Sequence, residues 1–157
     1  NPPKAALKAP VVTNVEEARM TAQTQTDRPP PIPESYRDIL DKKGFAHIAS
    51  IGPNGQPQST PVWYGWDGTF LKFSTTKARQ KYRNLVRNPK VSASITDPDA
   101  PYRYLEVRGV AEIEDDPDKT FIDEMSRKYI GKHYSWNQPG DERVIVKIRP
   151  EHVTGQG

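Results

Sequence analysis

Tight turns between short apolar segments are the feature that most restricts how this chain can fold. Gly52-Pro53-Asn54-Gly55 separates an apolar segment at Phe45–Ile51 from a second one at Gln58–Trp66. Asp67-Gly68 then leads into a third segment at Thr69–Ser74. Asn-Gly and Asp-Gly favour hairpin turns, because both residues of these pairs tolerate positive φ. The sequence therefore predicts a meander of three antiparallel strands.

Three further strand patterns follow, at Lys90–Thr96, Tyr102–Glu114 and Arg143–Arg149. The second alternates apolar and polar residues, and Gly109 in its middle predicts a bulge or a sharp bend. Helix signals lie in three places: Pro33–Gly44, Lys77–Lys90 and Asp115–Gly131. Six mostly antiparallel strands with three short helices predict a mainly β fold, a small closed or half-open barrel.

One folded domain is expected over residues 32–157. Residues 1–31 are rich in proline, alanine, threonine and glutamine. This composition predicts a flexible or extended N-terminal arm. Met20 resembles a natural start, so the residues before it are expected to be either upstream sequence or sequence foreign to the natural chain.

Composition excludes several classes of protein. The chain has 157 residues and no cysteine, so it forms neither a disulfide nor a thiolate metal site. No apolar run approaches the roughly 20 residues of a membrane span, and the N-terminus lacks the apolar core of a signal peptide. We therefore expect a cytoplasmic protein without membrane contact. The net charge is only +3, and the basic excess is central, which favours a small anionic ligand over nucleic acid.

The basic centre begins where the third strand ends. Ser74-Thr75-Thr76 closes that strand, and the cations Lys77, Arg79 and Lys81 follow at the predicted start of a helix. Hydroxyl groups, free helix N–H groups and cations together suit a phosphate. Two other interpretations stay open: the cations form a solvated helix face, or Thr76 is simply the N-cap. Arg83 and Arg87 share another face of the helix and are predicted to be surface charges.

No catalytic residue can be assigned. His47, His133 and His152 are far apart and lack metal-ligand spacing, so no metal site is predicted. No nucleophile lies beside a plausible base. If the protein is an enzyme, an organic cofactor is expected to carry the chemistry. Aromatic residues such as Trp63 and Trp136 could line the pocket of a flat ligand, although strand aromatics more often pack in a core.

Three sequence blocks carry a resemblance to a known family. They are G-x-P-x-x-x-P-V-W at residues 55–63, K-x-R-N-L-x-x-N-P at residues 81–89, and V-x-G-x-A-x-I at residues 107–113. Across residues 34–153 the chain resembles the pyridoxamine 5'-phosphate oxidase-like split β-barrel proteins, the FMN-binding type of split barrel. Within that superfamily it is most similar to the deazaflavin oxidoreductases of mycobacteria and other actinobacteria that use coenzyme F-420.

The resemblance implies a homodimer with two cofactor sites at its interface. The ring system of the cofactor would lie along Ser59, Thr60, Pro61, Val62 and Trp63. Its phosphate would be held by Ser74, Thr75 and Thr76 with Lys77, Arg79 and Lys81. Among these, Lys81 matches the lysine of the K-x-R-N-L block. Tyr134 and Trp136 of the second subunit would close the site.

The resemblance leaves a choice of cofactor. The deazaflavin carries a phosphodiester and a polyglutamate tail, so several cations suit it better than they suit the single phosphate of FMN. The expected function is a coenzyme F-420-dependent reductase that transfers hydride to a small conjugated or heterocyclic substrate, with water or a tyrosine as proton donor. The alternatives are an FMN-dependent oxidase or reductase of the pyridoxamine phosphate oxidase type, and a non-catalytic carrier of a cofactor or another flat ligand such as haem.

Overall fold

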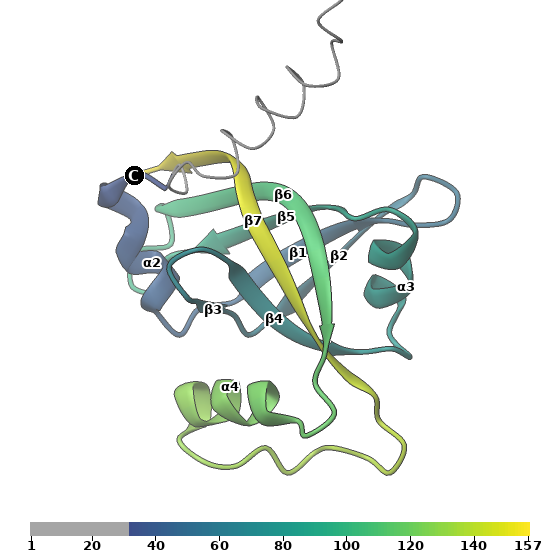
Figure 1. Ribbon diagram of the computed structural model, residues 1–157. Helices are drawn as coiled ribbons and strands as arrows, with labels where there is room; N and C mark the ends of the chain where they lie inside the picture. Colours follow the sequence, from purple (N-terminus) through teal and green to yellow (C-terminus); the bar gives the residue numbers. More distant parts are fainter. Residues whose placement is uncertain (1–31) are drawn as a thin grey trace, which may run out of the picture.

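The described chain forms one antiparallel sheet accompanied by short helices. The structure, a computed structural model, describes residues 32–157, so the arm expected at residues 1–31 lies outside the described residues. The strands follow the order β2-β1-β5-β6-β7-β4-β3, and Figure 1 shows that the sheet is strongly curved. The C-terminal strand, drawn in yellow, therefore lies inside the sheet, between β6 and β4. The predicted mainly β fold is confirmed.

The strands are β1 (Ala46–Ile51), β2 (Pro57–Val62), β3 (Gly65–Trp66), β4 (Leu71–Thr76), β5 (Lys90–Thr96), β6 (Tyr104–Asp115) and β7 (Arg143–Gln156). The helices are a 3-10 turn, η1 (Glu34–Tyr36), followed by α2 (Arg37–Asp41), α3 (Gln80–Arg87) and α4 (Thr120–Ile130). Within residues 32–157, no helix is long and apolar enough to cross a membrane.

The predicted number of six strands is wrong, because the segment expected at residues 58–66 is divided. Its first part is β2, which pairs with β1, and its last part is β3, which pairs with β4. Between them the backbone of Tyr64 turns to α4: its N–H donates to Tyr129 Oη at 3.1 Å, and its carbonyl accepts from Lys128 Nζ at 2.8 Å. Two side chains of α4 thus replace the hydrogen bonds of a neighbouring strand, and the sheet has seven strands.

Apolar side chains on the inner face of the sheet make the core. Along β5 the buried positions are Val91, Ala93 and Ile95, which alternate with more exposed residues, as the sequence predicts. Phe73 of β4 and Ile148 of β7 are both fully buried. Because burying one large apolar side chain contributes about 1.5–3 kcal/mol, this inner face stabilises the curvature of the sheet.

The bulge predicted at Gly109 is confirmed. The pairing register between β6 and β7 shifts between Arg108 and Gly109, and Gly109 lies opposite Pro150. A Cβ atom added to Gly109 would lie 2.1 Å from the carbonyl oxygen of Arg149. Only glycine allows the two strands to approach so closely, so this residue determines the bend of the long β6–β7 ribbon.

Replacing Gly109 by alanine is expected to lower the free energy of unfolding by about 1–3 kcal/mol, because the new methyl group must displace backbone. Urea unfolding measures the change. Gly65→Ala is the control, since its Cβ would meet only the flexible end of Met125, with Cε at 3.1 Å. Equal losses in the two variants would contradict the assignment of a special backbone approach to Gly109.

Helix α2 is attached to the barrel by its backbone and by an ionic cluster. Tyr64 Oη donates to the carbonyl of Ile39 at 2.6 Å. Asp97, only 2% exposed, accepts from Lys42 Nζ at 2.8 Å and from Arg103 Nη1 at 2.8 Å. The Lys42 ammonium, a backbone N–H and the Arg103 guanidinium hold the pKa of the Asp97 carboxyl well below its usual range. This carboxylate joins α2 to the loop between β5 and β6.

Helix α4 lies beneath β3 and β4 in Figure 1. The Asp116 carboxylate accepts from the N–H groups of Thr120 at 3.1 Å and Phe121 at 3.0 Å, so it caps the first turn. Gly131, with φ of 72°, ends the helix as the sequence predicts. The helix signal expected from Asp115 lies too early, because a turn separates Asp115 and Asp116 from the first helical residue, Thr120.

Candidate functional site

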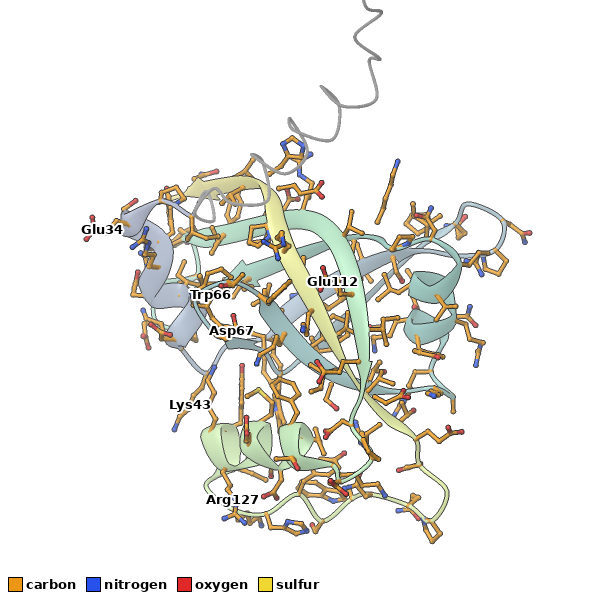
Figure 2. All side chains as sticks on the ribbon, viewed as in Figure 1. Glu34, Lys43, Trp66, Asp67, Glu112 and Arg127 are labelled. Atoms are coloured by element: carbon orange, nitrogen blue, oxygen red, sulfur yellow. The ribbon has the colours of Figure 1, made fainter. Side chains whose placement is uncertain are left out.

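A groove lies between the end of β2, helix α4 and the loop that follows α4. Its volume is about 450 Å³, and it is lined by Phe45, Pro61, Val62, Trp63, Ser74, Ile122, Met125, Tyr134, Trp136 and Arg143. In Figure 2, Arg127 lies on the side of α4 that faces away from the sheet. Trp66 lies on the opposite side of the helix, at the sheet. Most of the lining is apolar, and the volume lies in the range of ligand pockets.

Stacked aromatic rings make one wall of this groove. The Trp63 and Tyr129 rings lie 5.2 Å apart at 14°, and Tyr134 approaches Trp63 edge-on at 6.3 Å. Tyr129 Oη donates to the carbonyl of Gly44 at 2.7 Å, which fixes its ring. Burial raises the pKa of Tyr129 to about 12, so this phenol stays neutral. The Trp63 ring is therefore supported from behind by a rigid partner.

Ser74, Tyr134 and Arg143 bring polar groups to the groove. The Arg143 guanidinium donates to Ser74 Oγ at 3.5 Å, to Tyr134 Oη at 3.2 Å and to Asn137 Oδ1 at 3.2 Å. It also lies 5.1 Å from the centre of the Tyr134 ring. All of these partners are neutral, so the groove holds a positive charge beside its aromatic wall.

The loop that carries Tyr134 is held by one carboxylate. Asp123 of α4 accepts from the backbone N–H of Tyr134 at 3.0 Å, from Arg127 at 2.9 Å and from His133 at 2.6 Å. The Tyr134 N–H and the Arg127 side chain lower the pKa of Asp123. Asp123 therefore keeps the loop against the helix and places Tyr134 in the groove.

The structure brings part of the predicted cofactor site together. The predicted residues that line the groove are Pro61, Val62, Trp63, Ser74 and Trp136. Ser59 and Thr60 lie on β2 before this lining. The resemblance assigned Tyr134 and Trp136 to the second subunit, but in the structure both line the groove of their own chain.

The other predicted phosphate ligands differ in their surroundings. Thr75 and Thr76 are buried in β4. Lys77 Nζ lies 3.2 Å from Asp115 and 3.6 Å from Glu142, and Asp115 raises its pKa. These carboxylates already compensate the charge of Lys77, so its role as a phosphate ligand stays a prediction with little support from the geometry.

Lys81 and Thr60 have polar atoms that the described chain leaves without partners. Burial and the neighbouring Arg79 lower the pKa of Lys81, and within residues 32–157 no carboxylate lies within ion-pair distance of it. Thr60 Oγ1 is buried and, in the same part of the chain, finds no hydrogen-bond partner. Asn84, three residues after Lys81, donates to Gln58 Oε1 at 3.4 Å, so α3 and β2 are neighbours here. Because an unpaired buried polar group costs about 1–3 kcal/mol, the Thr60 hydroxyl indicates a polar ligand, and the half-buried Lys81 ammonium lies on the neighbouring helix.

Helix α3 begins later than the sequence predicts. Thr76 is the last residue of β4 and pairs with Arg143, so the predicted N-cap role of Thr76 is wrong. The helix starts at Gln80, and no side chain caps it. Arg83 and Arg87 are exposed, which agrees with their prediction as surface charges.

Several groove residues were not predicted. Ile122 and Met125 belong to the apolar stripe of α4, and that stripe gives no sign that one edge meets a groove. Phe45 and Arg143 stand at the starts of predicted strands, and nothing local distinguishes them from ordinary strand residues. Among the described residues, no group of three His, Asp or Glu side chains could hold a metal ion.

Comparison with known proteins identifies the family. The model of the pyridoxamine 5'-phosphate oxidase family matches residues 32–157, the whole described part of the chain. The chain belongs to this family. The resemblance found in the sequence is thereby confirmed, and with it a relationship to oxidoreductases of the flavin and deazaflavin type. No curated protein matches the chain significantly.

Solved structures of the same fold support membership in the pyridoxamine 5'-phosphate oxidase family. A protein described as an F420 reductase is 42% identical, covers 78% of this chain and 98% of its own, and superimposes with a TM-score of 0.72. A conserved hypothetical protein from Mycobacterium tuberculosis is 28% identical, with coverages of 80% and 85% and a TM-score of 0.64. A putative pyridoxamine 5'-phosphate oxidase from Listeria innocua is 24% identical, with coverages of 78% and 95% and a TM-score of 0.60. This last likeness shows the fold alone.

Proposed function

We propose that this protein is a homodimeric reductase that uses the deazaflavin coenzyme F-420 to reduce a small conjugated or heterocyclic substrate. The observation that carries the proposal is the 42% identity to an F420 reductase, which extends over 98% of that chain. The arrangement of the groove and of the unpaired polar groups beside it supports the same function. The members of the family named as oxidases keep FMN as the alternative cofactor.

The residues present fit such a cofactor. A groove of about 450 Å³ with the Trp63 wall accepts a flat ring. Lys81 and the unpartnered Thr60 Oγ1 are suited to bind a phosphate group, because a half-buried ammonium and a free hydroxyl gain most from an anion. Arg79 adds a second, exposed cation two residues before Lys81. The proposed site therefore extends from the groove toward α3.

The bound deazaflavin would supply a hydride from its ring carbon. The task of the chain is to orient the substrate, to exclude water and to provide a proton. We assign this last task to Tyr134. Its oxygen accepts an N–H from Arg143 at 3.2 Å, and within residues 32–157 its own hydroxyl proton has no acceptor. The guanidinium would stabilise the negative charge left on that oxygen.

The experiment that tests the proposal is a titration of the purified protein with coenzyme F-420 and, separately, with FMN. Tight binding of F-420 with little binding of FMN is expected. The reverse preference would establish the FMN alternative, and binding of neither would refute the assignment. If F-420 binds but its reduced form is not oxidised by a panel of enones, quinones and tetrapyrroles, the protein is a carrier. Light scattering in the same buffer tests the expected dimer.

A further inference from the structure

The Arg143 guanidinium, proposed above to stabilise the Tyr134 oxygen, has further donors that this role does not use. A guanidinium has five N–H donors. Three of them are used, on Ser74, Tyr134 and Asn137, and all three acceptors are uncharged. In the described part of the chain, no carboxylate lies within 4 Å of this guanidinium, whereas Arg103 and Arg127 each have one within 3 Å. Arg143 therefore keeps donors and an uncompensated charge for a ligand.

The position of Arg143 strengthens the interaction of its charge with an anionic ligand. It begins β7, where it pairs with Thr76, and it is partly buried behind Tyr134 and Ser74. A guanidinium stays ionised at all physiological pH values and offers two parallel donors to a carboxylate. In a partly desolvated groove such a pair is stronger than at the open surface. Three neutral hydrogen bonds also hold the side chain, so a ligand would not have to order it first.

The cations proposed for the cofactor phosphate are different residues. Arg79 and Lys81 belong to the start of α3 and do not line the groove, whereas Arg143 lines it together with Trp63 and Met125. Of the residues predicted for the phosphate, only Ser74 also lines the groove, and the cations proposed for the phosphate lie outside it. We therefore assign the anion that would meet Arg143 to a different molecule. The apolar part of this molecule contacts the groove lining.

We propose that Arg143 selects substrates that carry a carboxylate, so that this groove takes an unsaturated carboxylic acid. The conjugated part lies against the apolar lining, and the carboxylate accepts the free N–H groups of Arg143. Tyr134 then stands beside the same end of the substrate, because its hydroxyl is 3.2 Å from that guanidinium. The reduction of such an acid rests on the proposed reductase function, whereas its binding to Arg143 does not.

A matched pair of ligands tests the proposal without any turnover. Cinnamate and methyl cinnamate share the conjugated ring and differ in the charge. Each is titrated into the full chain without cofactor, and binding is followed by quenching of tryptophan fluorescence, since Trp63 and Trp136 line the groove. The wild-type protein is expected to bind the acid roughly 10- to 100-fold more tightly than the ester.

Three variants assign this preference to a residue. Arg143→Gln should bring the acid to within about 2-fold of the ester, and Arg143→Lys should keep part of the preference. Arg83→Gln removes an exposed cation of α3 outside the groove; it is the control and should keep all of the preference. The proposal is overturned if the wild type does not prefer the acid, if Arg143→Gln keeps the preference, or if Arg83→Gln abolishes it. Failure of F-420 to bind would refute the reductase function and leave this ratio unchanged.

Discussion

Replacing Lys81 by alanine is expected to weaken the binding of coenzyme F-420 by roughly 10- to 100-fold, the effect of losing one charged hydrogen bond to a phosphate. Lys81 is half-buried, and the described chain supplies it with no anionic partner. The fold should tolerate the change, because alanine removes a desolvated charge and leaves no carboxylate unpaired. Fluorescence titration of the cofactor gives the dissociation constant, and urea unfolding shows whether the fold is kept.

Lys77→Ala is the matched control for this experiment. Lys77 lies four residues earlier in the same basic segment, but its ammonium is already paired with Asp115 and Glu142. Its removal should change the cofactor affinity by less than about 3-fold. A large loss in Lys77→Ala with little change in Lys81→Ala would place the phosphate elsewhere and refute the assignment.

The same lysine predicts a pH dependence. Burial and Arg79 lower the pKa of Lys81 in the protein without ligand. A lysine with a lowered pKa loses its charge at a lower pH than an ordinary lysine does. Cofactor affinity in the wild type should therefore fall early as the pH rises into the alkaline range, and the Lys81→Ala variant should lack this decline.

Replacing Tyr134 by phenylalanine is expected to lower kcat by roughly 100-fold with any substrate that is reduced, because a positioned proton donor contributes about that much. The ring remains, so its contacts with Trp63 and Arg143 are kept. The dissociation constant of the cofactor should change little. Stopped-flow oxidation of reduced F-420 separates the chemical step from product release.

Tyr102→Phe is the control for Tyr134→Phe, since Tyr102 is 92% exposed and lies outside the groove. It should leave kcat unchanged. If Tyr134→Phe also leaves kcat unchanged, the proton comes from water and Tyr134 only shapes the groove. A weaker binding of cofactor in Tyr134→Phe, with kcat preserved, would likewise contradict the role of proton donor.

Features of the fold that depend on residues adjacent in the sequence could be predicted from it. The turn at Asn54-Gly55 and the helix end at Gly131 follow from the positive φ that glycine permits, and the bulge at Gly109 follows from its lack of a Cβ atom. The extent of β7 could not be predicted, because Pro150 suggests the end of a strand. Pro150 stands opposite the bulge at Gly109, where a missing N–H is tolerated, and the strand continues to Gln156.

The candidate site could be predicted only in part, because several of its contacts join residues that are distant in the sequence. Trp63 and Ser74 follow from a resemblance that is local in sequence. The compensation of Lys77 depends on Asp115 and Glu142, which come from distant segments, and no pattern within the basic stretch reveals them. Arg143 is likewise recognised as a groove residue only once β7 is seen beside β4.

The position of β7 has a consequence for the order in which the protein can fold during synthesis. Because β7 lies between β6 and β4, a nascent chain that ends before residue 143 holds two sheet fragments with unpaired edges, β2-β1-β5-β6 and β4-β3. Ser74 and Arg143 meet only when the last strand has left the ribosome and joined both fragments. The groove is therefore one of the last parts to form, and until then the unpaired strand edges are open to pairing with other chains.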